Sequence, residues 1–277
     1  MSPRARKEAA RYATTKHDLS SRQVSRFLGI ARTTLSYTHR PKNDEAIESR
    51  MKYLAGRHRR WGLLKIHNLL WRERLVAKSK SKSERIYRKL RLQIKTRRRQ
   101  KLPKVVRVPF EPATKPNEIW SFDFIHDYFE TNRRLKCLTI VDDCSKRSPG
   151  LFPAYSITSR DMIDFFDSVP KLPSKLRCDN GPEMSSREFM DWATKRNIEI
   201  EFIEPGKPIQ NAYIESFNSR FRNECLNEEL FFDLEDAQRK IERWRRVYNE
   251  KRPHSSLGMK TPKEFEEEFE QQPDAGR

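Results

Sequence analysis

The sequence predicts an α/β fold, a mixed sheet covered by helices, preceded by an all-helical basic region. Three observations support this prediction. Apolar residues recur at helical spacing between residues 20 and 90, and four prolines between Pro103 and Pro116 then interrupt that pattern. After them come three segments of strand character and then alternating helices and strands. We therefore expect a basic helical region at 1–102, a linker at 103–117, an α/β core at 118–232, and a C-terminal helix with an acidic tail at 233–277.

Charge separates the two halves of this 277-residue chain. The net charge is +19, and residues 1–117 hold 33 Lys and Arg against 8 Asp and Glu, whereas the remaining residues hold 25 against 31. A balance this basic is unusual for an enzyme of small neutral metabolites and favours a polyanion as partner of the front half. A merely solvated basic tail is the alternative.

The chain contains no apolar run of the roughly 20 residues that span a bilayer and no signal-peptide core. We expect a soluble, intracellular protein that does not bind membranes. The four cysteines lack the close paired spacing of a zinc site, so we expect reduced and mostly buried thiols.

The front half contains a predicted helix-turn-helix. Apolar residues from Val24 to Leu28 precede Gly29, and a second helix is expected at about 31–37. That helix would offer Arg32 and Thr33 to a DNA groove, although an ordinary helical hairpin would give the same pattern. Further helices are expected over 44–75, with a break near 61–62, and from residue 81. The basic run that follows, with Arg97, Arg98 and Arg99, would neutralise phosphates without selecting a base sequence.

The catalytic half opens with a strand in which aromatic residues alternate with Asp123. On a strand the aromatic side chains share one face and Asp123 lies on the other. Strands are also expected at 136–141, 150–155, 175–178 and 198–203, and helices at 160–169, at 186–196 and from 211.

Three carboxylates are the candidate catalytic groups: Asp123, Asp179 at a strand end, and Glu215 on a helix, with 35 residues between the last two. Convergent carboxylates repel one another unless cations lie between them. Two Mg²⁺ ions (or Mn²⁺) are the usual solution in phosphodiester chemistry. We therefore predict a metal-dependent phosphodiester site.

Arg222 lies seven residues after Glu215, and therefore on the same face of the predicted helix. It would hold a phosphate beside the metals, and a surface ion pair is the alternative. For Asp142 and Asp143 we prefer a structural role in a strand-end turn over metal binding.

Several motifs, in order, resemble an IS3-family insertion-sequence transposase, the second-frame product, with a DDE integrase-type core. They are W-S-F-D-F at 120–124, V-D-D at 141–143, D-N-G-P-E at 179–183, P-G-K-P-I-Q-N-A at 205–212, E-S-F-N at 215–218, and Y-N-E-K-R-P-H-S-S-L at 248–257. Met184 and Ser219 depart from the family pattern and put packing in doubt more than chemistry.

The resemblance implies an RNase H-like fold, with Asp123, Asp179 and Glu215 as catalytic metal ligands and Arg222 as the family's basic residue. We also assign Lys207, in the 205–208 loop, to DNA. The implied substrates are terminal inverted repeats and target DNA. The implied assembly is a homo-oligomer on DNA, fused or associated with an upstream-frame product, in the bacterial cytoplasm at the nucleoid.

Our first hypothesis is therefore a transposase that cleaves at the ends of an insertion sequence and transfers the freed strand. Two alternatives remain open from the sequence. One is a catalytically silent DNA-binding regulator of transposition, and the other is an RNase H-type nuclease that uses the same metal chemistry.

Overall fold

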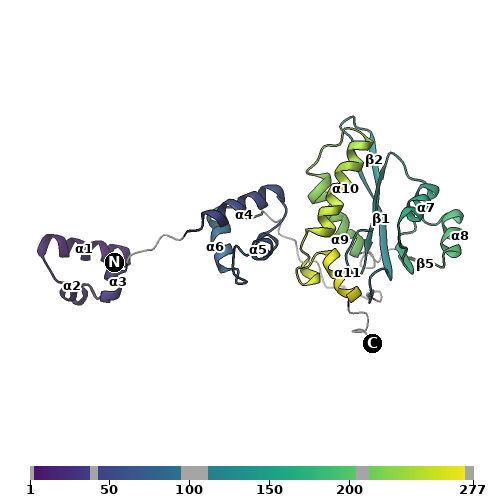
Figure 1. Cartoon of the computed structure of the whole chain (residues 1–277). Coiled ribbons are helices and arrows are strands. Elements are labelled where there is room, and N and C mark those ends of the chain that lie inside the picture. Colours follow the sequence, from purple (N-terminus) through teal and green to yellow (C-terminus); the bar gives the residue numbers. More distant parts are fainter. Residues whose placement is uncertain (1–2, 38–42, 95–111, 204–211, 272–277) are drawn as a thin grey trace, which may run out of the picture. The chain divides into compact units, whose positions relative to one another are not determined.

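The computed structural model describes residues 3–37, 43–94, 112–203 and 212–271. These residues form two compact units, Met1–Ala46 and Ile47–Arg277 (Figure 1). The predicted contacts of Arg97, Arg98, Arg99 and Lys207 lie outside the described residues.

The first unit contains α1 (Pro3–His17), α2 (Ser21–Leu28) and α3 (Arg32–Ser36). Ser20 and Gln23 cap the start of α2 reciprocally, and Gly29 ends it with a left-handed φ of 59° that glycine adopts without a Cβ clash. The predicted helix, glycine turn and second helix are therefore confirmed. The sequence did not predict α1, which lacks an apolar stripe.

Three further helices, α4 (Glu45–Arg57), α5 (Leu63–Arg72) and α6 (Ser81–Lys89), enclose a hydrophobic cluster of their own. Met51, Ile66 and Leu70 are fully buried in it. The predicted break near residues 61–62 is confirmed between α4 and α5. Arg72 of α5 pairs with Glu264 at 2.6 Å, which joins this cluster to the C-terminal part of the second unit.

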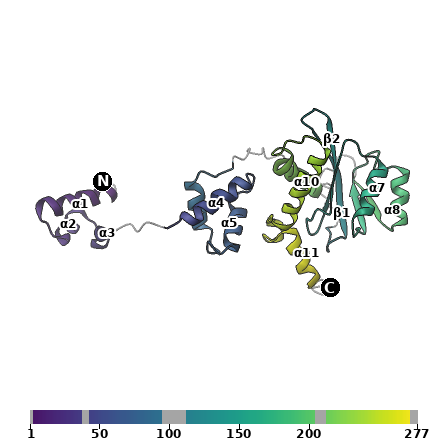
Figure 2. The ribbon, with the colours of Figure 1, turned by 45° about the horizontal axis from the view of Figure 1, so that its top comes forward.

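A five-stranded mixed sheet forms the centre of the second unit, with strand order β3-β2-β1-β4-β5. The middle strand β1 pairs antiparallel with β2 and parallel with β4. The mixed sheet flanked by helices is therefore as expected (Figure 2). The strands are β1 (Ile119–Tyr128), β2 (Arg134–Asp142), β3 (Leu151–Ala154), β4 (Lys175–Cys178) and β5 (Glu199–Phe202).

Each face of the sheet buries a separate hydrophobic cluster. Trp120 and Phe122 of β1 point to the face covered by α7 (Ser159–Ser168) and α8 (Arg187–Lys195). Ile125 of β1 points to the opposite face, which packs against three consecutive helical segments. These are α9 (Ala212–Phe221), the π-helix η2 (Arg222–Leu226) and α10 (Leu234–Glu250). The two helical layers lie on opposite sides of the sheet in Figures 1 and 2.

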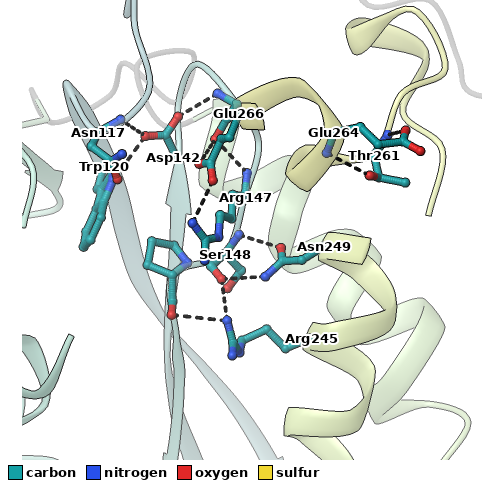
Figure 3. A network of polar contacts seen from close by, with 12 residues as sticks. Asn117, Trp120, Asp142, Arg147, Ser148, Arg245, Asn249, Thr261, Glu264 and Glu266 are labelled. Carbon is teal, nitrogen blue, oxygen red and sulfur yellow. Dashed lines mark hydrogen bonds and ion pairs between the residues drawn. The ribbon is translucent and has the colours of Figure 1, made fainter. Parts of the chain in front are cut away.

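The C-terminal helices are fastened to the loop between β2 and β3 (Figure 3). Asn249 of α10 exchanges two hydrogen bonds with the backbone of Ser148. The 3₁₀ turn η3 (Ser255–Leu257) leads to α11 (Pro262–Gln271), from which Glu266 accepts hydrogen bonds from Ser145 Oγ at 2.8 Å and Arg147 at 2.7 Å. The acidic tail expected at the C-terminus would be solvent-exposed, and this is wrong for Glu266, which is 9% exposed.

No helix in the described ranges is both long and apolar enough to cross a bilayer. The four cysteines are free, and all but Cys144 are buried, as expected.

Candidate active site

Asp123 lies in the middle of the central strand, on the face opposite its aromatic neighbours. Trp120 and Phe122 are buried beneath α7 and α8, whereas Asp123 is half-buried on the side of α9. Its Oδ1 accepts a hydrogen bond from Phe124 N–H at 2.7 Å. The strand alternation that predicted its orientation is therefore confirmed.

Asp179 directly follows β4, the parallel neighbour of β1, and its side chain is exposed. Its Oδ1 accepts a hydrogen bond from Gly181 N–H at 3.1 Å. A Cβ at residue 181 would lie 3.1 Å from the same oxygen, tighter than ordinary contact. The D-N-G turn thus allows the backbone to close on the carboxylate and fix its direction.

Glu215 is an exposed residue in the first turn of α9. Its neighbour Ile214 and Phe217, one turn later, are fully buried against the sheet and hold the helix there. The helix is therefore fixed on the face of the sheet that carries Asp123.

The charges of Asp179 and Glu215 act on the Asp123 carboxylate. Its pKa is raised to about 6, mainly by burial and also by these two charges, while the hydrogen bonds from Phe124 and Asn218 oppose the rise. Among the described residues, no three His, Cys, Asp or Glu side chains have closed to metal-binding geometry. Carboxylate oxygens are nevertheless the donors that Mg²⁺ and Mn²⁺ prefer, and a cation offsets this repulsion, so the donor set fits such an ion.

Asn218 is a further residue of the site that was not predicted from the sequence. It lies one helical turn after Glu215, and its amide donates a hydrogen bond to Asp123 Oδ2 at 2.9 Å. Its own Oδ1 is buried and has no partner within the described residues. The E-S-F-N motif contained a signal for this role, because residues three apart on a helix lie on the same face, so that Asn218 lies beside Glu215.

Replacing Asp123 with Asn is expected to stabilise the metal-free protein above pH 6. A carboxyl whose folded pKa exceeds its unfolded pKa destabilises the fold as pH rises from about 4 to about 6, and the loss persists above that. The gain should be on the order of 1–2 kcal/mol, given partial exposure. The Asn218 amide can rotate so that its unpartnered Oδ1 accepts from the new amide.

The measurement is the unfolding temperature of Asp123→Asn against the unchanged chain in EDTA, at pH 8 and at pH 4. The difference should shrink towards zero at the lower pH. A variant less stable than the unchanged chain at both pH values would contradict the repulsion.

Arg222 begins η2, directly after α9, and its side chain is 40% exposed. It donates to the backbone oxygen of His126 at 2.6 Å and lies 3.9 Å from Asp127. The structure therefore places it beside β1, where it has local partners of its own.

Asp142 is the last residue of β2 and Asp143 begins the turn after it; they are 1% and 2% exposed. Asp142 accepts hydrogen bonds from Cys144 N–H and Ser145 N–H. Burial raises the pKa of Asp143 to about 6, and its carboxylate pairs with Arg177. The turn interpretation is consistent with these contacts.

The first unit contains the other described candidates. Arg32 and Thr33 are exposed on α3. Together with Lys7 and Arg11 of α1 they line a groove of about 630 Å³. The lining includes three basic side chains and several threonine and serine hydroxyl groups, side chains of the kinds that contact DNA phosphates.

Comparison with known proteins agrees with this arrangement. Two family models described as integrase core domain match residues 113–208 and 196–262. An insertion element IS476 protein of Xanthomonas euvesicatoria is 38% identical over 96% of this chain and 78% of the relative. An insertion element IS407 protein of Burkholderia multivorans is also 38% identical, over 90% of this chain and 91% of the relative.

Among solved structures, a simian T-cell lymphotropic virus intasome chain shares the fold. The TM-score is 0.50 at 18% identity, and the match covers 78% of this chain and 74% of that one. The mixed sheet with helices on both faces is thus an RNase H-like integrase fold. The chain belongs to the insertion-element transposases that contain an integrase core domain.

Proposed function

We propose that this chain is a DDE-type polynucleotidyl transferase that cleaves DNA at the ends of its insertion element and joins the freed 3′-hydroxyl to a second phosphodiester. The observation that carries the proposal is the placement of Asp123, Asp179 and Glu215 on three elements that share one side of the sheet, with the other two charges acting on Asp123. IS3-family membership is part of this proposal.

The three carboxylates would hold two divalent cations, Mg²⁺ or Mn²⁺. Such ions supply activation of the attacking hydroxyl and stabilisation of the departing oxygen. The chain's own residues prepare the site. Asn218 and Phe124 N–H orient the Asp123 carboxylate, and Gly181 N–H orients Asp179. Because the pKa of Asp123 is about 6, its carboxylate is ionised at neutral pH and ready to bind a cation.

DNA would be held by groups outside the carboxylate set. Arg222 has five N–H donors, and its half-exposed guanidinium keeps donors for a phosphate while one bonds to His126 O. We assign Arg32 and Thr33 to DNA for the reasons given for α3, and Lys207 and residues 97–99 remain sequence-based assignments. The same proposal includes the domain limits at 102, 117 and 232. It also includes a homo-oligomer on DNA, association with an upstream-frame product, and a location at the nucleoid.

The decisive test uses the full chain with a plasmid that carries the DNA flanking its gene. Nicks at the element's ends and joined products should appear with Mg²⁺ or Mn²⁺ and not with EDTA, and Asp179→Asn should abolish both. Binding of end DNA without cleavage, even with the upstream-frame product added, would favour the silent regulator. Faster cleavage of an RNA–DNA hybrid than of duplex DNA would favour the RNase H-type nuclease.

Replacing Arg32 with Gln is expected to weaken duplex DNA binding and to reduce the slope of log K against log salt by about 1, because one phosphate contact is lost. The measurement is fluorescence anisotropy at several NaCl concentrations. Arg187→Gln on α8 changes the net charge equally, and its side chain is 95% exposed. Equal slopes for both variants would mean that charge alone, rather than α3, determines binding.

A further inference from the structure

The turn that follows β2 touches all three elements that carry the carboxylates. Asp142, the last residue of β2, begins it, and Asp143 and Lys146 follow. Asp142 stabilises the turn itself, through Cys144 N–H and Ser145 N–H, and binds β1 through Trp120 Nε1 at 3.1 Å (Figure 3). Both oxygens of Asp142 are therefore committed to structure.

Asp143 bonds to the two strands that carry Asp123 and Asp179. Its Oδ1 accepts from Ser121 Oγ at 2.7 Å, and its Oδ2 accepts from Arg177 Nη1 at 2.6 Å. Ser121 precedes Asp123 by two residues, and Arg177 precedes Asp179 by two. Side chains two residues apart along a strand point to the same face. Asp143 therefore binds β1 and β4 on the face that carries Asp123 and Asp179, two residues before each of them.

Lys146 connects the same turn to the third element. Its ammonium donates to the backbone oxygen of Asp143, and it lies 3.8 Å from the ring centroid of Tyr213. Tyr213 precedes Glu215 by two residues in the first turn of α9. Each of the three carboxylates is therefore preceded, two residues earlier, by a residue that contacts this turn.

The ion pair at the centre of this arrangement is fully buried. The side chains of Arg177 and Asp143 are 2% and 0% exposed, and Arg177 also donates to Glu201 of β5 at 2.7 Å. A buried ion pair contributes little net stability compared with apolar residues of similar size, because both charges lose their hydration. Its directional bonds instead fix which groups meet, and here they fix β1, β4 and β5 relative to the turn.

We infer that Asp143 is a positioning residue for the metal site: through Ser121 and Arg177 it fixes β1 and β4 so that Asp123 and Asp179 face a common point, while Lys146 of the same turn contacts α9. It does not touch the metal itself. The inference rests on the proposed role of these carboxylates as metal ligands, and it assigns the second aspartate of V-D-D a task in metal binding.

The test is Asp143→Asn in the full chain, with Mn²⁺ affinity measured by electron paramagnetic resonance in the absence of DNA. Replacement of groups that orient metal ligands commonly weakens binding about 10- to 100-fold, and we expect a loss of at least about tenfold here. Asparagine has nearly the same size as aspartate but no charge. The variant therefore removes the ion pair with Arg177 and keeps the pair between Arg177 and Glu201.

Glu266→Gln is the matched control. Glu266 is also a buried acid bonded to this turn, through Ser145 and Arg147, but it contacts none of the three carboxylate-bearing elements in those bonds. It should lower the unfolding temperature and leave Mn²⁺ affinity unchanged. If it weakened Mn²⁺ binding as much as Asp143→Asn, general integrity of the turn would explain the effect and the inference would be overturned.

Hydrogen exchange gives a second measurement that does not depend on a metal. In Asp143→Asn, peptides covering 119–124 and 175–181 should exchange faster, whereas Glu266→Gln should leave both unchanged. Unchanged exchange in Asp143→Asn would overturn the inference. If the unchanged chain and Asp179→Asn bound Mn²⁺ equally, the proposed metal site would fail instead, and the exchange data would still decide the role of Asp143.

Discussion

Replacing Glu215 with Gln is expected to reduce DNA cleavage and strand joining by at least about 10³-fold. The variant removes the charge of one of the three carboxylates proposed to bind the metals, and loss of several kcal/mol of charge stabilisation in the transition state corresponds to a factor of this size. Because the side chain is exposed on α9, the unfolding temperature should stay nearly unchanged. The measurement is the rate of end cleavage and strand joining under single-turnover conditions with Mg²⁺.

The control for this result is Glu235→Gln, an identical change at an exposed residue in the first turn of α10. It should leave the rate within about twofold, as expected for a surface substitution away from the site. Cleavage by Glu215→Gln at the rate of the unchanged chain would remove Glu215 from the site. Loss of activity in both variants would indicate an effect of net charge.

Acidification from pH 7.5 to pH 5 is expected to cost about 2 kcal/mol of stability through His254 alone. This side chain is 4% exposed, and burial followed by the charges of Arg252, Arg220 and Lys65 lowers its pKa to about 2. An unfolded histidine takes up a proton below about pH 6.5, whereas the folded one does not. Stability is therefore fully present above pH 6.5 and falls by about 1.4 kcal/mol per pH unit below it.

The variant that tests this is His254→Asn, which has an amide donor in place of the ring N–H and no titratable group. Its urea-unfolding free energy, followed by tryptophan fluorescence, should fall about 2 kcal/mol less than that of the unchanged chain between pH 7.5 and pH 5. His17→Asn, at an exposed residue of α1, is the matched control. Equal acid sensitivity in all three proteins would assign the effect to other groups.

The elements that position the site were largely predictable because their signals are local. Alternation around Asp123 predicts its face, Gly29 marks the end of α2, and the strand predicted at 175–178 places Asp179 at its end. Each of these depends on backbone geometry within a few residues. The helix and strand limits therefore agree with the structure to within a few residues over most of the catalytic unit.

What the sequence did not predict depends on contacts between distant segments. Asn218 acquires its role because α9 packs beside β1, and Glu266 is buried because α11 returns to the turn after β2. The bonds of Arg177 with Asp143 join residues 34 apart in the sequence. No local pattern distinguishes these side chains from ordinary surface charges, so their partners appear only in the folded chain.

The bond between Ser145 and Glu266 also sets an order in time. The two residues are 121 positions apart, so during synthesis the turn after β2 can gain its bonds to Glu266 only after α11 has left the ribosome. Chains released earlier keep the bonds of Asp143 to Ser121 and Arg177 but lack this attachment. We therefore expect them to resemble Glu266→Gln, with lower stability and the carboxylates of the sheet in place.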